Sequence, residues 1–221
     1  MNKITSITDQ PIRDVESDLL ESEKYANALT SFILESDTPL TIGMQGEWGT
    51  GKTSLMYMIR EKLDSFSKEN DAIATSWVNT WEYSMFKGVD QTTPAVLKGM
   101  LEKLKESCGG HWPRHGEMKQ KITKVGSFLG NVANQIVSSQ TGVDVKNAAG
   151  AESDELIADI AKIKADIKDV ISILLSDENN PYKKVVFFID DLDRINPKDA
   201  VEVLESLKNI FDIDSCIFII A

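Results

Sequence analysis

Apolar and polar stretches alternate along the chain in a way that predicts strands and helices in turn. Residues 40–44, 73–78, 185–189 and 216–221 are short apolar runs next to turn residues, which is typical of strands. The run at 185–189 is apolar throughout and matches a strand buried on both faces of a parallel sheet. The pattern therefore favours an α/β domain built on a parallel sheet.

Apolar residues at helical spacing predict helices between these strands. We expect one helix over about 14–35, one from 52 to about 66, one after residue 93 with Thr93 as N-cap and Pro94 at the first helical position, and one starting at Asn196 and Pro197. The buried stripes are Val15, Leu19, Tyr25, Ala26, Leu29, Phe32 and Ile33; Leu55, Met56, Ile59 and Leu63; Val96, Leu97, Met100, Leu101 and Leu104; and Ala200, Val203, Leu204, Leu207, Ile210 and Phe211.

Two further helical stretches lie between the second and third strands. Ser153 can cap a helix whose apolar residues alternate spacings of four and three: Leu156, Ile160, Ile163, Ile167, Val170 and Leu174. We favour packing within the domain over a coiled-coil arm, because three heptads are short. Residues 125–143 carry no charge and eight Ser, Asn, Gln or Thr residues, which favours a surface or self-associating helix over a membrane-surface element.

Composition narrows the class of protein. The chain has 221 residues, of which 42% are hydrophobic and 27% charged, as in a soluble globular protein. Its net charge of −11 argues against a broadly basic nucleic-acid surface. Two cysteines indicate no disulfide framework, and the N-terminus has no apolar signal core. We expect a cytoplasmic protein without a transmembrane segment, with peripheral membrane association left open.

The sequence GEWGTGKTS follows the first strand and satisfies the phosphate-loop pattern G-x-x-x-x-G-K-[ST]. Glycines let successive backbone N–H groups converge on an anion, and the helix that follows adds its positive end. Lys52 would reach the β- and γ-phosphates, and the Thr53 hydroxyl would bind Mg²⁺. The nucleotide-binding residues that we expect are Gly46, Glu47, Trp48, Gly49, Thr50, Gly51, Lys52, Thr53 and Ser54.

Carboxylates follow the apolar strand at 185–189. If this strand and the one at 40–44 share a parallel sheet, Asp190 and Asp191 meet the phosphate loop at the carboxyl edge. Asp190 could then hold Mg²⁺, and Asp191 could orient and deprotonate the attacking water. The alternative for the acids alone is a helix-entry turn. For Arg194, an ion pair with the neighbouring acids is favoured over nucleotide sensing.

Two other kinds of site are not favoured. The order NPKD at 196–199 is wrong for the guanine-reading NKxD element, and no strand-end DxxG turn is present, so we expect ATP rather than GTP by elimination. Cys108, His111 and His115 have types and spacing that permit zinc ligation, but a fourth ligand is not evident. We expect no zinc there and a flexible loop instead.

Taken together, these motifs resemble the KAP family of P-loop NTPases. The resemblance rests on GEWGTGKTS, WVNTWEY, VVFFIDDLDR with the INP that follows, and a lead-in with Pro11-Ile12 and Tyr25-Ala26. It covers most of 8–93 and 183–221, and the middle, about 94–181, shows no motif that we can assign to a named family. It implies a three-layer, additional-strand (ASCE-type) fold in which 216–221 lies between the strands at 40–44 and 185–189. It also implies Mg²⁺-dependent NTP hydrolysis at Lys52, Thr53, Asp190 and Asp191.

The resemblance also guides the domain organisation. We expect one KAP-type domain over 1–221, incomplete at its C-terminus, with a lead-in at 1–36, a phosphate-loop half at 37–93, a helical insertion at 94–181 and a second half at 182–221. Many family members carry transmembrane helices between the two motifs, and this insertion is not a clear membrane span. A final strand, a sensor residue and an arginine finger would follow Ala221.

Three functions are compatible with these residues. The first is an ATPase that acts as a conformational switch for protein partners, with a place in phage exclusion implied by some bacterial family members. The second is a nucleotide-binding scaffold with little turnover, in which the insertion forms the surface for partners or self-association. The third is a small-molecule kinase, which would need an acceptor pocket that the sequence does not show.

Overall fold

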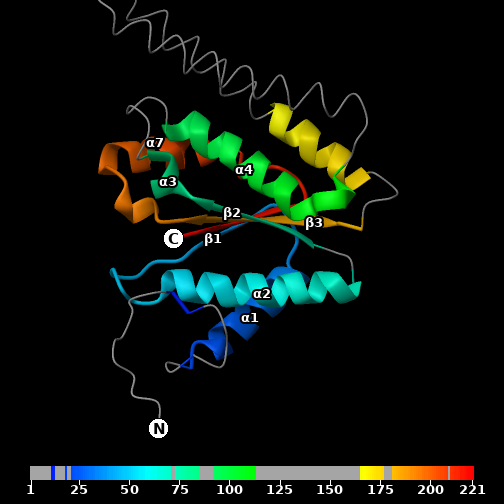
Figure 1. Ribbon diagram of the computed structural model, residues 1–221, viewed down its shortest axis with the longest axis horizontal. Helices are drawn as coiled ribbons and strands as arrows, with labels where there is room; N and C mark the ends of the chain where they lie inside the picture. The colour runs from blue at the N-terminus through cyan, green and yellow to red at the C-terminus, as the bar shows by residue number, and fades with distance from the viewer. Residues whose placement is uncertain are drawn as a thin grey trace, which may run out of the picture.

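A parallel sheet forms the centre of the molecule in the computed structural model, which describes residues 11–12, 18, 21–70, 73–84, 92–112, 165–176, 181–208 and 210–221 (Figure 1). Its strands are β1 (Leu40–Gly43), β2 (Ile73–Asn79), β3 (Lys184–Asp190) and β4 (Cys216–Ile220). Their order across the sheet is β1-β4-β3-β2, and every pairing is parallel. The four apolar runs are therefore strands, as predicted.

The strand order confirms the α/β class and the additional-strand arrangement. β4 lies between β1 and β3, so the strand that precedes the phosphate loop does not pair with the strand that ends in Asp190. All four carboxyl ends point to one edge of the sheet, because the strands are parallel. Asn79 is the register partner of Asp190, which places both residues at that edge.

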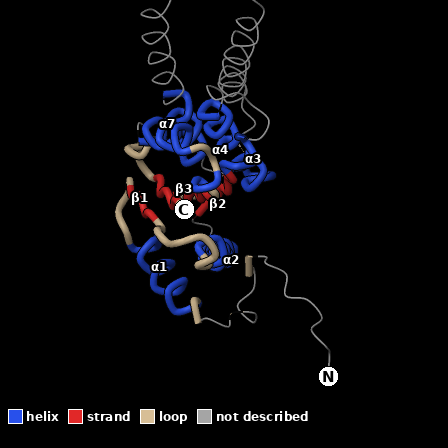
Figure 2. The backbone as a smooth tube through the Cα atoms, turned by 90° about the vertical axis from the view of Figure 1, so that its left-hand side faces the viewer, coloured by secondary structure: helices blue, strands red, loops and turns tan. Residues whose placement is uncertain are grey.

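Helices cover both faces of the sheet (Figures 1 and 2). One face carries α1 (Glu23–Glu35) and α2 (Lys52–Asn70). The other carries α4 (Thr92–Cys108), α7 (Pro197–Lys208) and the helical residues 165–176. Shorter helical segments are α3 (Thr80–Ser84), η3 (Gly109–His111) and η4 (Leu192–Arg194).

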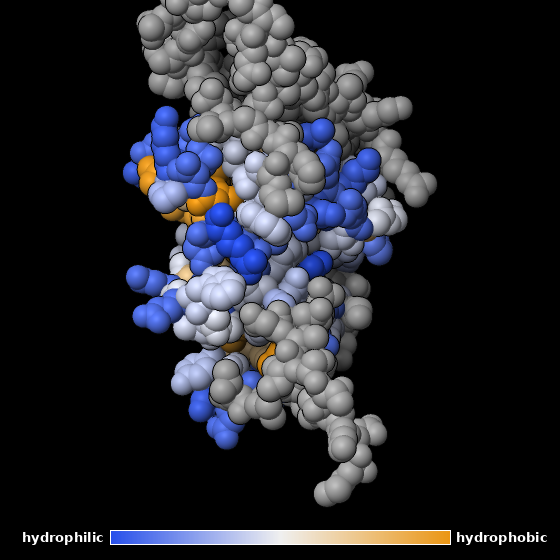
Figure 3. Space-filling model, turned by 60° about the vertical axis from the view of Figure 1, so that its left-hand side comes forward, coloured by the Kyte–Doolittle hydropathy of each residue, from blue (hydrophilic) through white to orange (hydrophobic). Residues whose placement is uncertain are grey.

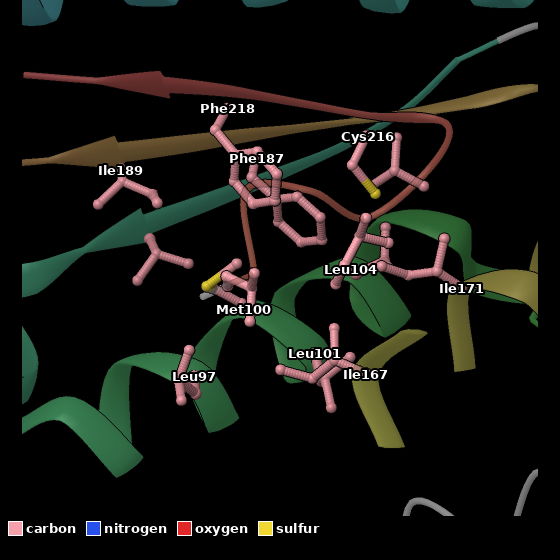
Figure 4. Packing of buried hydrophobic residues seen from close by; sticks show 14 of the residues in the cluster. Leu97, Met100, Leu101, Leu104, Ile167, Ile171, Phe187, Ile189, Cys216 and Phe218 are labelled. Carbon is pink, nitrogen blue, oxygen red and sulfur yellow. The ribbon is translucent and has the colours of Figure 1, made fainter. Parts of the chain in front are cut away.

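Strand β3 divides its side chains between two cores. Val185, Phe187 and Ile189 point to the α4 side, and Val186 and Phe188 point to the α2 side; all five are fully buried. In the α4 core the rings of Phe187 and Phe218 stack with centroids 5.3 Å apart, and α4 side chains including Met100 and Leu104 pack nearby (Figure 4). Alternating burial on both faces explains the uninterrupted apolar run.

The heptad stripe packs within the domain where the structure describes it. Ile167, Val170 and Leu174 are buried in the same core as α4 (Figure 4). The described part of this helix therefore packs within the domain, as we favoured, and does not form a coiled-coil arm. Leu156, Ile160, Ile163 and residues 125–143 lie outside the described residues. Over the part of the chain that is described, no helix is long and apolar enough to cross a membrane.

Two predicted helix starts are wrong. Helix α1 begins at Glu23, because Glu21 has a left-handed φ of 54° and the Asp18 carboxylate accepts the Glu23 N–H at 2.7 Å. One continuous helix over 14–35 is therefore not formed, and Val15 and Leu19 lie outside the described residues. The third helix begins at Thr92, so Thr93 is its second residue rather than its N-cap. The Thr93 hydroxyl is buried and has no hydrogen-bond partner in the described structure.

Three residues assigned to buried stripes lie on the surface. Tyr25 and Phe32 on α1 are 59% and 52% exposed, and Leu204 on α7 is 38% exposed. Each stripe was wider than the face that its helix buries, because a helix in an outer layer contacts the sheet through one side only. The face of the molecule at the carboxyl ends of the strands is largely hydrophilic (Figure 3).

We predict that Phe218→Ala lowers the free energy of unfolding by about 3–5 kcal/mol, because it removes a buried ring from the stack with Phe187 and leaves a cavity. The same substitution at exposed Phe32 is the control and should change stability by less than about 0.5 kcal/mol. Urea unfolding measures both. Equal effects at the two positions would show that the α4 core does not dominate stability.

Candidate functional site

The loop between β1 and α2 has a backbone that requires glycine. Gly49 and Gly51 have φ of 82° and 88°, in the left-handed region that side chains with a Cβ rarely adopt. A Cβ on Gly46 would lie 2.6 Å from Thr50 Oγ1. The loop ends at Lys52, the first residue of α2, so the positive end of a long helix points at the same place.

The acid turn, residues 190–194, faces this loop. The Asp190 carboxylate is buried, and its Oδ1 accepts hydrogen bonds from Thr53 Oγ1 at 3.2 Å and from the Asp191 N–H at 2.9 Å. Burial is the main cause that raises the pKa of Asp190, and these two donors oppose it. Thr53, in the first turn of α2, and Asp190, the last residue of β3, are 137 residues apart in sequence and are thus in direct contact.

Asp191 is held by two side chains. Its Oδ2 accepts a hydrogen bond from Asn79 Nδ2 at 2.6 Å, and its Oδ1 pairs with Arg194 Nε at 2.5 Å. Its backbone is left-handed, with φ of 60°. The Arg194 guanidinium also lies 6.0 Å from the centre of the Trp81 ring. Arg194 therefore makes the ion pair that the sequence favoured for it.

Lys52 bridges the loop and the acid turn. Its Nζ donates to the carbonyls of Gly46 at 3.0 Å and Glu47 at 3.3 Å. The same Nζ lies 3.3 Å from Asp193 Oδ2, with 16% of the Lys52 side chain and 44% of the Asp193 side chain exposed. Asp193, the third carboxylate of the acid turn, is therefore the one that pairs with Lys52.

A pocket of about 260 Å³ lies between the loop and the acid turn. Of the predicted site residues, Gly46 and Glu47 do not line it and contribute carbonyls to Lys52 instead. The residues that line it are Pro11, Ile12, Trp48, Gly49, Thr50, Gly51, Lys52, Thr53, Ser54, Asp190, Asp191, Asp193 and Arg194. The structure thus brings Lys52, Thr53, Asp190 and Asp191 to one pocket.

The lead-in forms part of the pocket wall. Ile12 donates its N–H to Ser54 Oγ at 3.0 Å and reaches the loop from 42 residues upstream. Trp48, which also lines the pocket, is 72% exposed. The sequence showed Pro11 and Ile12 as a feature of the family resemblance, and the structure places both at the loop.

Sequence reasoning missed Asn79, Thr80 and Asp193 as site residues. Thr80 Oγ1 donates to the backbone carbonyl of Asp190 at 2.9 Å, next to the Asn79 contact with Asp191. The available signal was that Asn79 and Thr80 follow an apolar strand directly. What the sequence lacked was the strand order, which makes β2 the neighbour of β3.

Helix α3 connects the acid turn to α4. Asn79 Oδ1 accepts the N–H groups of Trp81 and Glu82, at 3.0 and 3.3 Å, so one amide both caps α3 and holds Asp191. At the other end of α3, Tyr83 fits against Gly99 of α4, where an added Cβ would lie 2.3 Å from the Tyr83 ring. Asn79 and α3 therefore join the acids to α4, the first helix of the insertion.

The three residues weighed as zinc ligands are not shown together. Cys108 is buried in the α4 core, and burial raises the pKa of its thiol to about 12. His111 lies in η3 with its ring 6.0 Å from that of Tyr182, and His115 is outside the described residues. Among the residues that are described, no three His, Cys, Asp or Glu side chains are grouped to hold a metal ion.

Comparison with known proteins gives one family. The model of the KAP family P-loop domain matches residues 22–221. A solved structure of the ORC2 protein of Aeropyrum pernix, in ADPNP–ADP complexes, is similar with a TM-score of 0.41 and 14% identity. That alignment covers 97% of this chain and 43% of the ORC2 chain. No curated protein sequence matches. The family match spans both the loop and the acid turn, and the chain belongs to the KAP family of P-loop NTPases.

Proposed function

We propose that the pocket between the loop and the acid turn binds ATP with Mg²⁺ and hydrolyses it. The observation that carries the proposal is the contact between the Thr53 hydroxyl and the Asp190 carboxylate, 3.2 Å apart and beside Lys52. A hydroxyl from the start of a helix and a carboxylate from the end of a strand, next to a lysine, form the constellation that P-loop NTPases use for a metal-bound nucleotide.

The residues present fit a magnesium ion. Mg²⁺ prefers oxygen ligands and uses one or two protein oxygens together with phosphates and water. Thr53 and Asp190 supply two such oxygens at one point of the pocket. When bound, Mg²⁺ neutralises phosphate charge that would otherwise repel the carboxylates of the acid turn.

Lys52 and Asp191 take the other roles. The Lys52 ammonium would bind the β- and γ-phosphates, and the loop N–H groups with the start of α2 would stabilise the remaining phosphate charge. The Asp191 carboxylate would accept a hydrogen bond from the attacking water and take its proton as the water oxygen bonds to the γ-phosphorus. The bond from that phosphorus to the β–γ bridging oxygen would break, with ADP as the leaving group. Asn79 and Arg194 hold that carboxylate in place. ATP rather than GTP remains an expectation by elimination.

The contacts of α3 support a conformational switch. Asn79 and Thr80 touch the two acids, and Tyr83 touches α4 at Gly99. A rearrangement of the acids on hydrolysis would therefore move α3 and α4 together. Because α4 forms the start of the insertion, we propose that nucleotide state is passed to protein partners through that segment.

A nucleotide-binding scaffold with little turnover is the second candidate. It is favoured by the fact that both oxygens of Asp191 are already engaged, by Asn79 and by Arg194, which restricts access of a water molecule. Single-turnover incubation with Mg-ATP separates the two candidates. Release of phosphate supports the switch ATPase, and bound ATP that stays intact supports the scaffold.

We predict that Lys52→Ala abolishes measurable Mg-ATP binding in isothermal titration calorimetry, because the pocket loses the ammonium that pairs with the β- and γ-phosphates. Lys62→Ala is the control: it removes a cation of α2 that pairs with Glu23 of α1 and does not line the pocket. Circular dichroism should show a native fold for both variants. Undiminished affinity in folded Lys52→Ala would refute the assignment of the loop.

We predict that Asp191→Asn changes nucleotide affinity only a few-fold but slows hydrolysis by about 10²–10⁴, as expected for loss of a general base. Asp190→Asn should instead raise the Mg²⁺ concentration needed for half-maximal binding, since it removes a metal ligand. Phosphate release and Mg²⁺ titrations measure the two effects. Wild-type rates in both variants would show that the acids have other roles.

The resemblance implies phage exclusion as a biological setting, and we include it in the proposal. Bacteria expressing the wild-type chain should plate fewer phage than bacteria expressing Lys52→Ala at equal protein level. Equal plating across a phage panel would contradict this setting without bearing on ATP hydrolysis.

A further inference from the structure

Asp193 is the acid of the turn that the proposed mechanism does not use. Asp190 is bound to Thr53, and Asp191 is bound to Asn79 and Arg194. The Asp193 carboxylate instead pairs with Lys52 Nζ at 3.3 Å, inside the pocket lining. It therefore contacts the cation to which the proposed function assigns the phosphates.

The geometry points to Asp193 as a residue that sets nucleotide affinity by competing with phosphate for Lys52. This inference rests on the proposed nucleotide binding at the loop. An ammonium that pairs with Asp193 must exchange that carboxylate for phosphate oxygens when a nucleotide binds. Nucleotide binding therefore breaks the Lys52–Asp193 ion pair. The net free energy of binding is smaller than in a phosphate loop whose lysine has no acidic partner.

The excess of carboxylates in the pocket also weakens the binding of phosphate groups. Its described lining carries the carboxylates of Asp190, Asp191 and Asp193 against the cations Lys52 and Arg194. Within this set, Arg194 is paired with Asp191, which leaves Lys52 to Asp193. Asp193 also repels incoming phosphates, because like charges a few ångströms apart disfavour each other even at partial exposure.

The position of Asp193 allows it to move aside. Its side chain is 44% exposed, whereas the Lys52 side chain is 16% exposed and is also held by the Gly46 and Glu47 carbonyls. The carboxylate can turn to solvent at small cost while the ammonium stays in the pocket. Asp193 would therefore limit affinity without blocking the site, and it would recapture Lys52 as phosphate leaves.

The test is the dissociation constant of Mg-ATP, measured by isothermal titration calorimetry for the wild type and for Asp193→Asn. The substitution keeps the shape of the side chain and removes its charge. We expect Asp193→Asn to bind Mg-ATP about 2- to 5-fold more tightly, the range for loss of a partly exposed competing ion pair. Asp193→Glu keeps the charge and should stay close to the wild type.

Asp37→Asn is the matched control, because it removes one negative charge at the opposite edge of the sheet, in the exposed segment between α1 and β1. It should bind Mg-ATP as the wild type does. Equal tightening by Asp37→Asn and Asp193→Asn would overturn the inference, because a general charge effect would then explain the result. Circular dichroism checks the fold, and Asp193→Ser is the second neutral variant.

The outcomes separate this inference from the function on which it rests. If the wild type binds Mg-ATP and both neutral variants bind equally or more weakly, Asp193 does not compete for Lys52 and the inference is wrong. Weaker binding would indicate that Asp193 helps to hold the metal-bound phosphates. If the wild type binds no Mg-ATP, the proposed function fails and the inference fails with it.

Discussion

The burial of β3 is the constraint on which the rest of the structure depends. This strand pairs with β2 on one side and β4 on the other, and its side chains fill the cores on both faces of the sheet. Its register fixes where the apolar run ends, so Asp190 and Asp191 emerge at the same edge as the loop after β1. A shift by one residue would place carboxylates in a core and remove them from the pocket.

Much of the fold could be predicted, because long apolar runs and glycine patterns leave few alternatives. The run at 185–189 required a strand covered on both faces, and Gly49 and Gly51 adopt the left-handed φ that the loop pattern implied. The start of α1 could not be predicted in the same way. Apolar spacing continues upstream of Glu23, but the positive φ of Glu21 and the Asp18 hydrogen bond break the helix there, and local periodicity does not report such contacts.

The candidate site was predictable only where a residue belongs to a motif. Lys52, Thr53, Asp190 and Asp191 were named from loop and strand-end patterns, and the structure brings them to one pocket. Asn79 and Asp193 depend on strand order and on side-chain pairing across more than a hundred residues. Pairwise charge contacts of this kind leave no periodic trace in a sequence. The sequence therefore predicted the phosphate-binding and metal-binding residues of the pocket, but only the structure identified the polar and charged side chains that pair with them.

The placement of the four tryptophans gives the chain a built-in optical reporter. Trp48 stands at the pocket with 72% of its surface exposed, and Trp81 lies over Arg194. Trp77 is stacked between Tyr57 and Phe188, and Trp112 is buried. Collisional quenchers in solution reach Trp48 far more readily than Trp112. Intrinsic fluorescence should therefore follow occupancy of the pocket against a constant background, without any attached dye.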